Sequence, residues 1–82
     1  MSTRFVYILR SLSTPERRYV GLTSNVGRRL EAHNAGASPF TAKFRPWRLV
    51  VAIAFRDSAH ADAFESYLKS GSGAAFARRH FW

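Results

Sequence analysis

The chain has 82 residues, enough for one small domain with a modest core. It contains no cysteine, which excludes disulfides, thiolate zinc sites and thiol nucleophiles, and no apolar run approaches the roughly 20 residues that cross a bilayer. Thirteen lysines and arginines against five acidic residues give a formal charge of +8, which favours a polyanionic partner, above all nucleic acid. We therefore expect a soluble, cytoplasmic protein that forms a single domain over residues 1–82 and does not act at a membrane.

The chain opens with two predicted strands. Residues 5–9 and 18–22 are rich in β-branched and aromatic side chains, and the turn residues between them include a proline, which is typical of an antiparallel hairpin. If Leu9 pairs near Arg17, Tyr7 lies opposite Tyr19 on the same face.

A helix is predicted next. Three successive candidate N-caps at residues 23–25 precede a segment that runs as a helix to about Ala35, and Gly36 is a natural stop. Residues 37–46, with two prolines, are expected to form a loop.

The second half of the chain predicts one long strand and two helices. Residues 47–55 form the clearest strand, expected at the centre of the sheet with both faces covered. One face is predicted to carry Trp47, Leu49, Val51, Ile53 and Phe55. A helix follows to about Ser70 and ends at the glycines of residues 71–73, with Phe64, Tyr67 and Leu68 facing inward. The tail is expected to form a third, short helix. The order β-β-α-β-α-(α) predicts an α+β domain in which helices flank a three-stranded antiparallel sheet.

Single residues carry little chemistry by themselves. Arg29 and His33 lie one helical turn apart, and Tyr7 and Tyr19 form an ordinary cross-strand aromatic pair. Glu65 has two interpretations, an ion pair with Lys69 at i,i+4 or an oxygen ligand for a hard divalent cation.

In chain order these residues resemble a known family. The Val6-Tyr7 pair, the segment YVGLTSNVGRRLEAHN that begins at Tyr19, and Glu65 are similar to motifs of the GIY-YIG nuclease superfamily. The resemblance covers nearly the whole chain, and TAKFRPWRLV and AFESYLKSGSG are similar to its small stand-alone bacterial branch, which is linked to the excinuclease C N-terminal domain. The departures are Phe5 for the first motif glycine, Leu22 where some members carry a lysine, and no counterpart of a late asparagine.

The resemblance implies a metal-dependent endonuclease that hydrolyses DNA in repair or recombination and recognises structures such as branches, flaps or damage. Glu65 would hold a single Mg²⁺ or Mn²⁺, Arg29 would neutralise phosphoryl charge, and His33 would relay a proton. Tyr7 or Tyr19 would activate the water, its pKa lowered by Arg29 and the metal. A non-catalytic nucleic-acid-binding module that retains the fold is the alternative.

The remaining polar residues predict a track for the substrate. The expected phosphate contacts are Arg28, Asn34, Thr41, Lys43, Arg45, Arg48, Lys69, Arg78 and Arg79. Family members that cut specific DNA sites usually carry additional DNA-binding domains, for which 82 residues leave no room. We therefore expect that the chain acts either as a homodimer or with a separate targeting protein.

Overall fold

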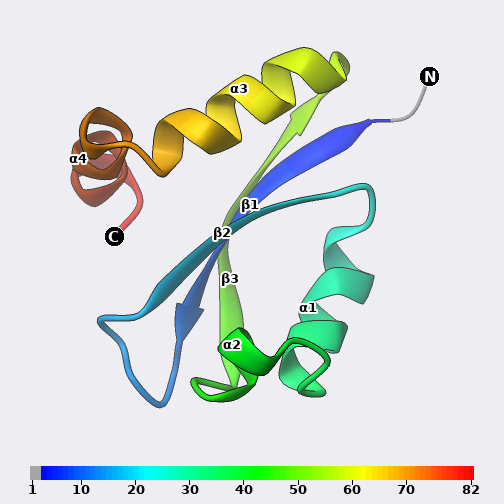
Figure 1. Ribbon diagram of the computed structural model, residues 1–82, viewed down its shortest axis with the longest axis vertical. Coiled ribbons are helices and arrows are strands. Elements are labelled where there is room, and N and C mark those ends of the chain that lie inside the picture. The colour runs from blue at the N-terminus through cyan, green and yellow to red at the C-terminus, as the bar shows by residue number, and fades with distance from the viewer. Residues whose placement is uncertain (1–2) are drawn as a thin grey trace.

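Three antiparallel strands form the sheet, in the order β2-β1-β3, and helices flank it (Figure 1). The computed structural model describes residues 3–82. The elements are β1 (Arg4–Ser11), β2 (Arg18–Thr23), α1 (Val26–Asn34), α2 (Pro39–Ala42), β3 (Trp47–Phe55), α3 (Ser58–Leu68) and α4 (Gly71–His80). The predicted α+β architecture is confirmed.

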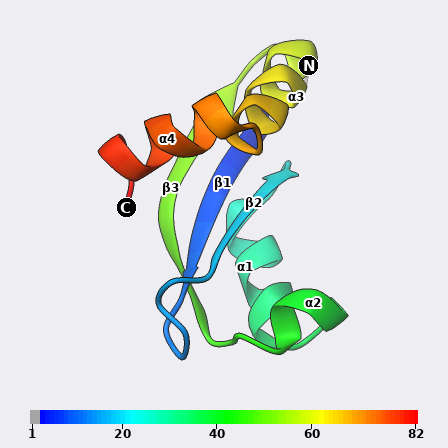
Figure 2. The same ribbon diagram turned by 60° about the vertical axis from the view of Figure 1, so that its left-hand side comes forward.

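Helices cover both faces of the sheet. Tyr7, Leu9 and Trp47 form a buried cluster on one face, joined by Leu30 of α1. Val6 and Ile8 point to the other face and pack against residues of α3 and α4. Figure 1 shows α3 and α4 on one side of the strands and α1 and α2 on the other, and Figure 2 shows the two helix pairs toward opposite ends of the strands. Because side chains alternate along β1, the two clusters are separated by the sheet itself. The face that bears Tyr7 is called the tyrosine face below, and the other is called the reverse face.

The central strand is β1, so the prediction that residues 47–55 occupy the centre is wrong. Val6, Tyr7, Ile8 and Leu9 are all at most 1% exposed. On β3, by contrast, the alanines at positions 52 and 54 are exposed. The apolar run of residues 47–55 led to the wrong prediction because the small apolar side chains on its second face resemble those of a strand that is covered on both faces.

A bulge in β3 overturns the predicted faces of that strand. Ile8 pairs with Val51 but the adjacent Leu9 pairs with Leu49, which leaves Val50 as the extra residue. The alternation shifts by one residue at this point. Trp47 consequently lies on the tyrosine face, whereas Val51 and Phe55 pack on the reverse face.

The hairpin register differs from the expected one by two residues. Leu9 pairs with Tyr19, and Tyr7 pairs with Gly21. A shift of two preserves the side to which each residue points, because the strand period is two. Tyr7 and Tyr19 are therefore diagonal neighbours on one face, with ring centroids 6.1 Å apart.

The helix signals were correct for the starts of α1 and α3, where the side chains of Asn25 and Asp57 accept from backbone amides. Gly36 has φ of 84°, as a left-handed stop requires.

Three predictions about the later helices are wrong. The expected loop contains α2, which begins at Pro39, and Gly71 opens α4 rather than ending α3, with Ser70 as the N-cap. Tyr67 is 40% exposed instead of facing inward. Within residues 3–82, no helix is long and apolar enough to span a membrane.

Candidate active site

Four side chains from three elements form one chain of hydrogen bonds on the tyrosine face. Arg29 Nε of α1 donates to the Tyr7 hydroxyl of β1 over 3.3 Å, and that hydroxyl lies 2.9 Å from His33 Nε2. His33 Nδ1 lies 2.8 Å from Thr41 Oγ1 of α2. Tyr7, His33 and Thr41 are each at most 1% exposed. The structure thus joins three of the predicted catalytic residues and places Thr41, predicted as a phosphate contact, behind them.

The donors and acceptors order this chain in one direction. A guanidinium can only donate, so the Tyr7 oxygen accepts from Arg29. Thr41 Oγ1 donates to the Ser38 carbonyl over 3.4 Å, so it accepts from His33 Nδ1, and the unprotonated Nε2 of that neutral tautomer accepts from the Tyr7 hydroxyl. His33 is therefore a neutral acceptor toward Tyr7.

Burial controls the proton affinities of the pair. Burial lowers the pKa of His33 below its usual value, and the positive charge of Arg29 lowers it further. Burial also raises the pKa of Tyr7, against the hydrogen bond from Arg29, which acts to lower it. Arg29 by itself does not lower the pKa of Tyr7 below its usual value, because desolvation of the phenolate outweighs the nearby guanidinium. Removal of the Tyr7 proton therefore depends on a base in direct contact, and His33 is in that position.

Two aromatic rings complete the wall around His33. The Tyr19 ring meets the His33 ring edge-on with centroids 4.8 Å apart. Trp47 lies 6.5 Å beyond Tyr19, and its indole N–H donates to the Thr41 carbonyl over 2.7 Å. Tyr19 is half-buried, whereas Tyr7 is closed off from solvent. Packing on all sides fixes the histidine ring in the orientation that Tyr7 needs.

Gly21 is a site residue that sequence reasoning missed. It faces Tyr7 across the hairpin, and a Cβ atom placed on it would lie 2.6 Å from the Tyr7 hydroxyl oxygen. Real Cβ atoms do not approach so closely, so only glycine leaves room for the hydroxyl at this place. The correct register would have identified it, because that register pairs Gly21 with Tyr7. No sequence signal placed Thr41, because its position depends on the path of residues 37–46.

His33 makes folding stability sensitive to mild acid. Its folded pKa lies below the value of about 6.5 in an unfolded chain, so below that pH the unfolded state binds more protons. We expect the free energy of unfolding to be retained at pH 7.5 and to fall toward pH 5.5, measured by urea titration with tryptophan fluorescence. His33→Gln should lose this pH dependence, whereas His80→Gln, at an exposed position, should keep it. Equal slopes for the parent and His33→Gln would contradict the assignment.

Glu65 lies apart from the hydrogen-bonded chain. Its side chain is 15% exposed and forms an ion pair with Lys69 on α3. Within residues 3–82 no hydrogen bond or ion pair links it to Tyr7, Arg29 or His33, and no group of three His, Asp or Glu side chains is arranged to hold a metal ion. Of the two interpretations of Glu65, the structure therefore contains the ion pair with Lys69.

Two predicted phosphate contacts have structural roles instead. Thr41 is buried against His33 and is closed to a substrate. The Asn34 amide accepts from the Trp47 backbone N–H over 2.6 Å and donates to the Trp47 carbonyl over 3.0 Å, which ties the end of α1 to the start of β3. Short polar side chains at loop borders are equally suited to backbone contacts, and the tertiary structure decided between the two uses.

The predicted cations do not follow one track. Arg28 lies beside Arg29 in a pocket of about 300 Å³ at the start of α1. Lys43 and Arg45 follow α2, and Arg48 is an exposed residue of β3. The exposed Arg78 and Arg79 belong to α4, which packs on the reverse face, and Lys69 is occupied by Glu65. Arg28 thus shares a pocket with Arg29 at the start of α1.

The site thus consists of a hairpin that presents two tyrosines to a helix bearing Arg29 and His33, and comparison with known proteins shows the family. The model of the GIY-YIG catalytic domain matches residues 4–79, and the chain belongs to this family.

Two curated relatives match part of the chain. It is 35% identical over 52 residues to the structure-specific endonuclease subunit SLX1 homolog of Giardia intestinalis. This match covers 60% of this chain and 14% of that protein. It is 41% identical over 54 residues to the structure-specific endonuclease subunit SLX1 of Debaryomyces hansenii, which covers 58% of this chain and 16% of that protein. The matched region is thus a small fraction of each relative.

Proposed function

We propose that this chain is a divalent-metal-dependent endonuclease that hydrolyses phosphodiester bonds in DNA and selects branched, flapped or damaged structures. The chain of hydrogen bonds from Arg29 through Tyr7 to His33, inside a GIY-YIG domain, carries the proposal. The names of the two relatives support a structure-specific nuclease and, through the word subunit, a protein partner. A role in DNA repair or recombination is part of the proposal, as is either a homodimer or a separate targeting protein.

Tyr7 acts as a relay between water and His33 in the proposed reaction. Tyr7 is closed to solvent in the structure, so the proposed reaction requires the attacking water to reach its oxygen beside the half-buried Arg29 when the substrate binds. As that water loses a proton to the Tyr7 oxygen, the Tyr7 proton passes over 2.9 Å to His33 Nε2. The ordinary pKa values of tyrosine and histidine differ by about 3.5 units, and burial widens that gap at both groups, so moving the Tyr7 proton to His33 costs more than about 5 kcal/mol before the substrate and the cation act. Arg29 offsets part of that cost because its Nε–H already contacts the oxygen on which negative charge develops.

Arg28 and Arg29 are the proposed contacts for the scissile phosphate region. They line one pocket together with Thr23, Ser24 and Asn25 at the start of α1. Paired guanidinium groups suit the doubly anionic transition state of phosphoryl transfer. Tyr19 shapes the site through its contact with the His33 ring.

The metal-binding side chains of the protein would suit a cation that is held partly by the protein and partly by the substrate phosphate. Glu65 supplies one half-buried carboxylate, and magnesium is commonly held by one or two carboxylates together with phosphate and water. Such an ion, Mg²⁺ or Mn²⁺, would supply Lewis-acid stabilisation of phosphoryl charge when bound. Lys69 must release Glu65 for that purpose, and its exposed position allows it to turn into solvent.

Glu65→Gln tests the metal assignment. Purified protein is incubated with plasmid, flap and branched DNA in Mg²⁺ or Mn²⁺ and in EDTA. We expect cleavage by the parent only with the cation, and a loss of about 10³-fold for Glu65→Gln, since Lewis-acid stabilisation contributes several kcal/mol.

Two control variants separate the roles of Glu65. Asp62→Asn, at an exposed position of the same helix, should cleave like the parent. Lys69→Gln, which removes the ion pair but keeps the carboxylate, should stay within a few-fold of it. Loss of activity in Lys69→Gln to the level of Glu65→Gln would identify the ion pair, not metal binding, as the function of Glu65. Binding without cleavage in any cation would favour the non-catalytic module.

A further inference from the structure

Three arginines stand side by side on the reverse face of the sheet. Arg10 of β1 pairs in register with Arg18 of β2 and with Arg48 of β3. They point away from Tyr7, because Arg10 is an odd number of residues from Tyr7 along β1. Neighbouring strands are about 4.8 Å apart, so the three α-carbons lie within about 10 Å. This set of Arg10, Arg18 and Arg48 is called the arginine row.

No carboxylate neutralises the arginine row within residues 3–82. The ion pairs there are Asp57 with His60 and Glu65 with Lys69, both on α3 or its cap. Like charges on directly opposed strand positions are destabilising. The pKa of Arg18 is lowered by burial and by the positive charge of Arg10. A row of three cations therefore persists at a cost that a bound anion would remove.

The turn between β1 and β2 holds two of these guanidinium groups in place. The Pro15 carbonyl accepts from Arg18 Nη1 over 2.6 Å and from Arg10 Nε over 3.2 Å. Arg18 also stacks over the Trp82 ring at 4.8 Å. Because Arg10 is fixed through Nε, its two terminal nitrogens stay free to donate to a ligand. Part of the ordering cost of binding is thereby met in advance.

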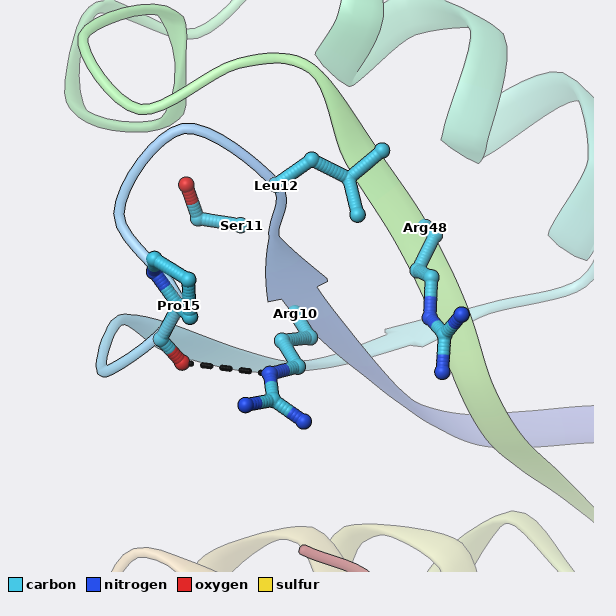
Figure 3. A pocket seen from close by; sticks show the side chains of 5 residues that line it. All are labelled: Arg10, Ser11, Leu12, Pro15 and Arg48. Atoms are coloured by element: carbon cyan, nitrogen blue, oxygen red, sulfur yellow. Dashed lines mark hydrogen bonds between the residues drawn. The ribbon is translucent and has the colours of Figure 1, made fainter.

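Arg10 and Arg48 border a shallow pocket of about 220 Å³ (Figure 3). Figure 3 shows both guanidinium groups pointing in the same direction, away from Leu12 and Ser11 at the other end of the pocket. Two guanidinium groups on neighbouring strands that point the same way suit the oxygens of one phosphate group or of two neighbouring ones.

We propose that the arginine row binds the backbone phosphates of a second nucleic-acid segment, while a first segment occupies the tyrosine face. The inference rests on the proposed function in taking that first segment as DNA at Tyr7. A straight duplex against one face of the sheet does not reach the other face, whereas two arms that diverge from a branch reach both. The arginine row thus favours branched over linear DNA, because only a branched molecule places a second duplex arm on the reverse face.

Phosphate fits the arginine row better than an acidic protein partner does. Protein interfaces depend on apolar and aromatic anchors, and the pocket offers only Leu12 and Pro15 beside its cations. The backbone of a nucleic acid presents phosphate charges at regular short intervals. Such a series of anions can pair with the cations that the arginine row presents on three neighbouring β-strands.

The test measures binding in EDTA, where no cleavage occurs. A labelled three-way junction and a linear duplex of equal total length are titrated by fluorescence anisotropy at several salt concentrations. Each phosphate contact contributes about 0.9 to the slope of log affinity against log salt. We expect Arg10→Gln/Arg48→Gln to reduce the junction slope by about 1.8 and to leave the duplex slope unchanged.

A matched control removes the same charge elsewhere. Arg17→Gln/Arg56→Gln alters two exposed arginines outside the row and should affect junction and duplex equally and weakly. Arg48→Gln alone changes an exposed side chain that makes no hydrogen bond within residues 3–82, so it should fold normally and give about half of the slope change.

Several outcomes would overturn the proposal. Equal slopes for the parent and the row variant, or an equal loss on the duplex, would exclude a second-arm contact. Polyglutamate that binds the parent but not the row variant, with junction binding intact, would assign the row to an acidic protein instead. If the row variant lowers the junction slope but the parent cleaves no DNA, the arginine row is supported and the proposed nuclease activity is overturned. If the parent cleaves DNA but the row variant leaves the junction slope unchanged, the arginine row is overturned and the nuclease activity is supported.

Discussion

Tyr7→Phe is expected to reduce DNA cleavage by about 10²- to 10⁴-fold, the usual contribution of general acid–base catalysis. The change removes one oxygen and leaves His33 Nε2 and Arg29 Nε without their shared partner. Because buried groups that lose a hydrogen-bond partner cost about 1–3 kcal/mol, some loss of stability should accompany the loss of activity. Single-turnover cleavage of a branched substrate in Mg²⁺, together with urea unfolding, measures both effects.

Two tyrosine variants serve as controls for this result. Tyr67→Phe alters a 40% exposed residue of α3 and should leave activity and stability unchanged. Tyr19→Phe addresses the question of which tyrosine is the base. Its ring packs against His33 while the hydrogen bond to His33 Nε2 belongs to Tyr7, so its activity should fall less than that of Tyr7→Phe. A larger loss in Tyr19→Phe would transfer the role of base to Tyr19.

Gly21→Ala is expected to impair cleavage about as strongly as Tyr7→Phe, although Gly21 carries no functional group. Its Cβ would lie 2.6 Å from the Tyr7 oxygen and 2.7 Å from the ring carbon that bears it. Tyr7 must then move away from His33 and Arg29, and the relay is broken. Overpacking of this kind costs about 1–3 kcal/mol of stability, measured by thermal or urea unfolding.

Gly27→Ala is the matched control for that substitution. A Cβ at Gly27 meets only Asn25 Oδ1, at an ordinary 3.8 Å, and the position lies inside α1. Alanine there should raise stability by up to about 1 kcal/mol and leave cleavage unchanged. Gly21→Ala with the activity of the parent would show that Tyr7 does not need its present position.

Local rules predicted most elements of this fold. Asn25 and Asp57 cap the helices that were expected to start there, and Gly36 takes the left-handed conformation expected of it. These signals are reliable because capping and turn geometry depend on residues within one helical turn of each other. The errors came where pairing between distant segments matters, as at the bulge that leaves Val50 unpaired in register.

The candidate site could be predicted only in part. Tyr7, Arg29 and His33 were identified through their order in the chain, and the structure places them within hydrogen-bond distance. The effect of Arg29 on the pKa of Tyr7 was overestimated, because burial, a property of the packed domain, raises that pKa by more than the guanidinium lowers it. Glu65 remains a proposed ligand whose structural partner is Lys69.

The sequence by itself determined the succession of strands and helices, the strong positive charge and the residue types available for chemistry. These depend on composition and on contacts between near neighbours in the chain. Tertiary structure alone decided that Gly21 makes room for the Tyr7 hydroxyl, that Thr41 holds His33, and that three arginines from three strands meet on the reverse face. Each of these depends on strand register and packing, which bring together residues 8 to 38 positions apart and leave no local trace in the sequence.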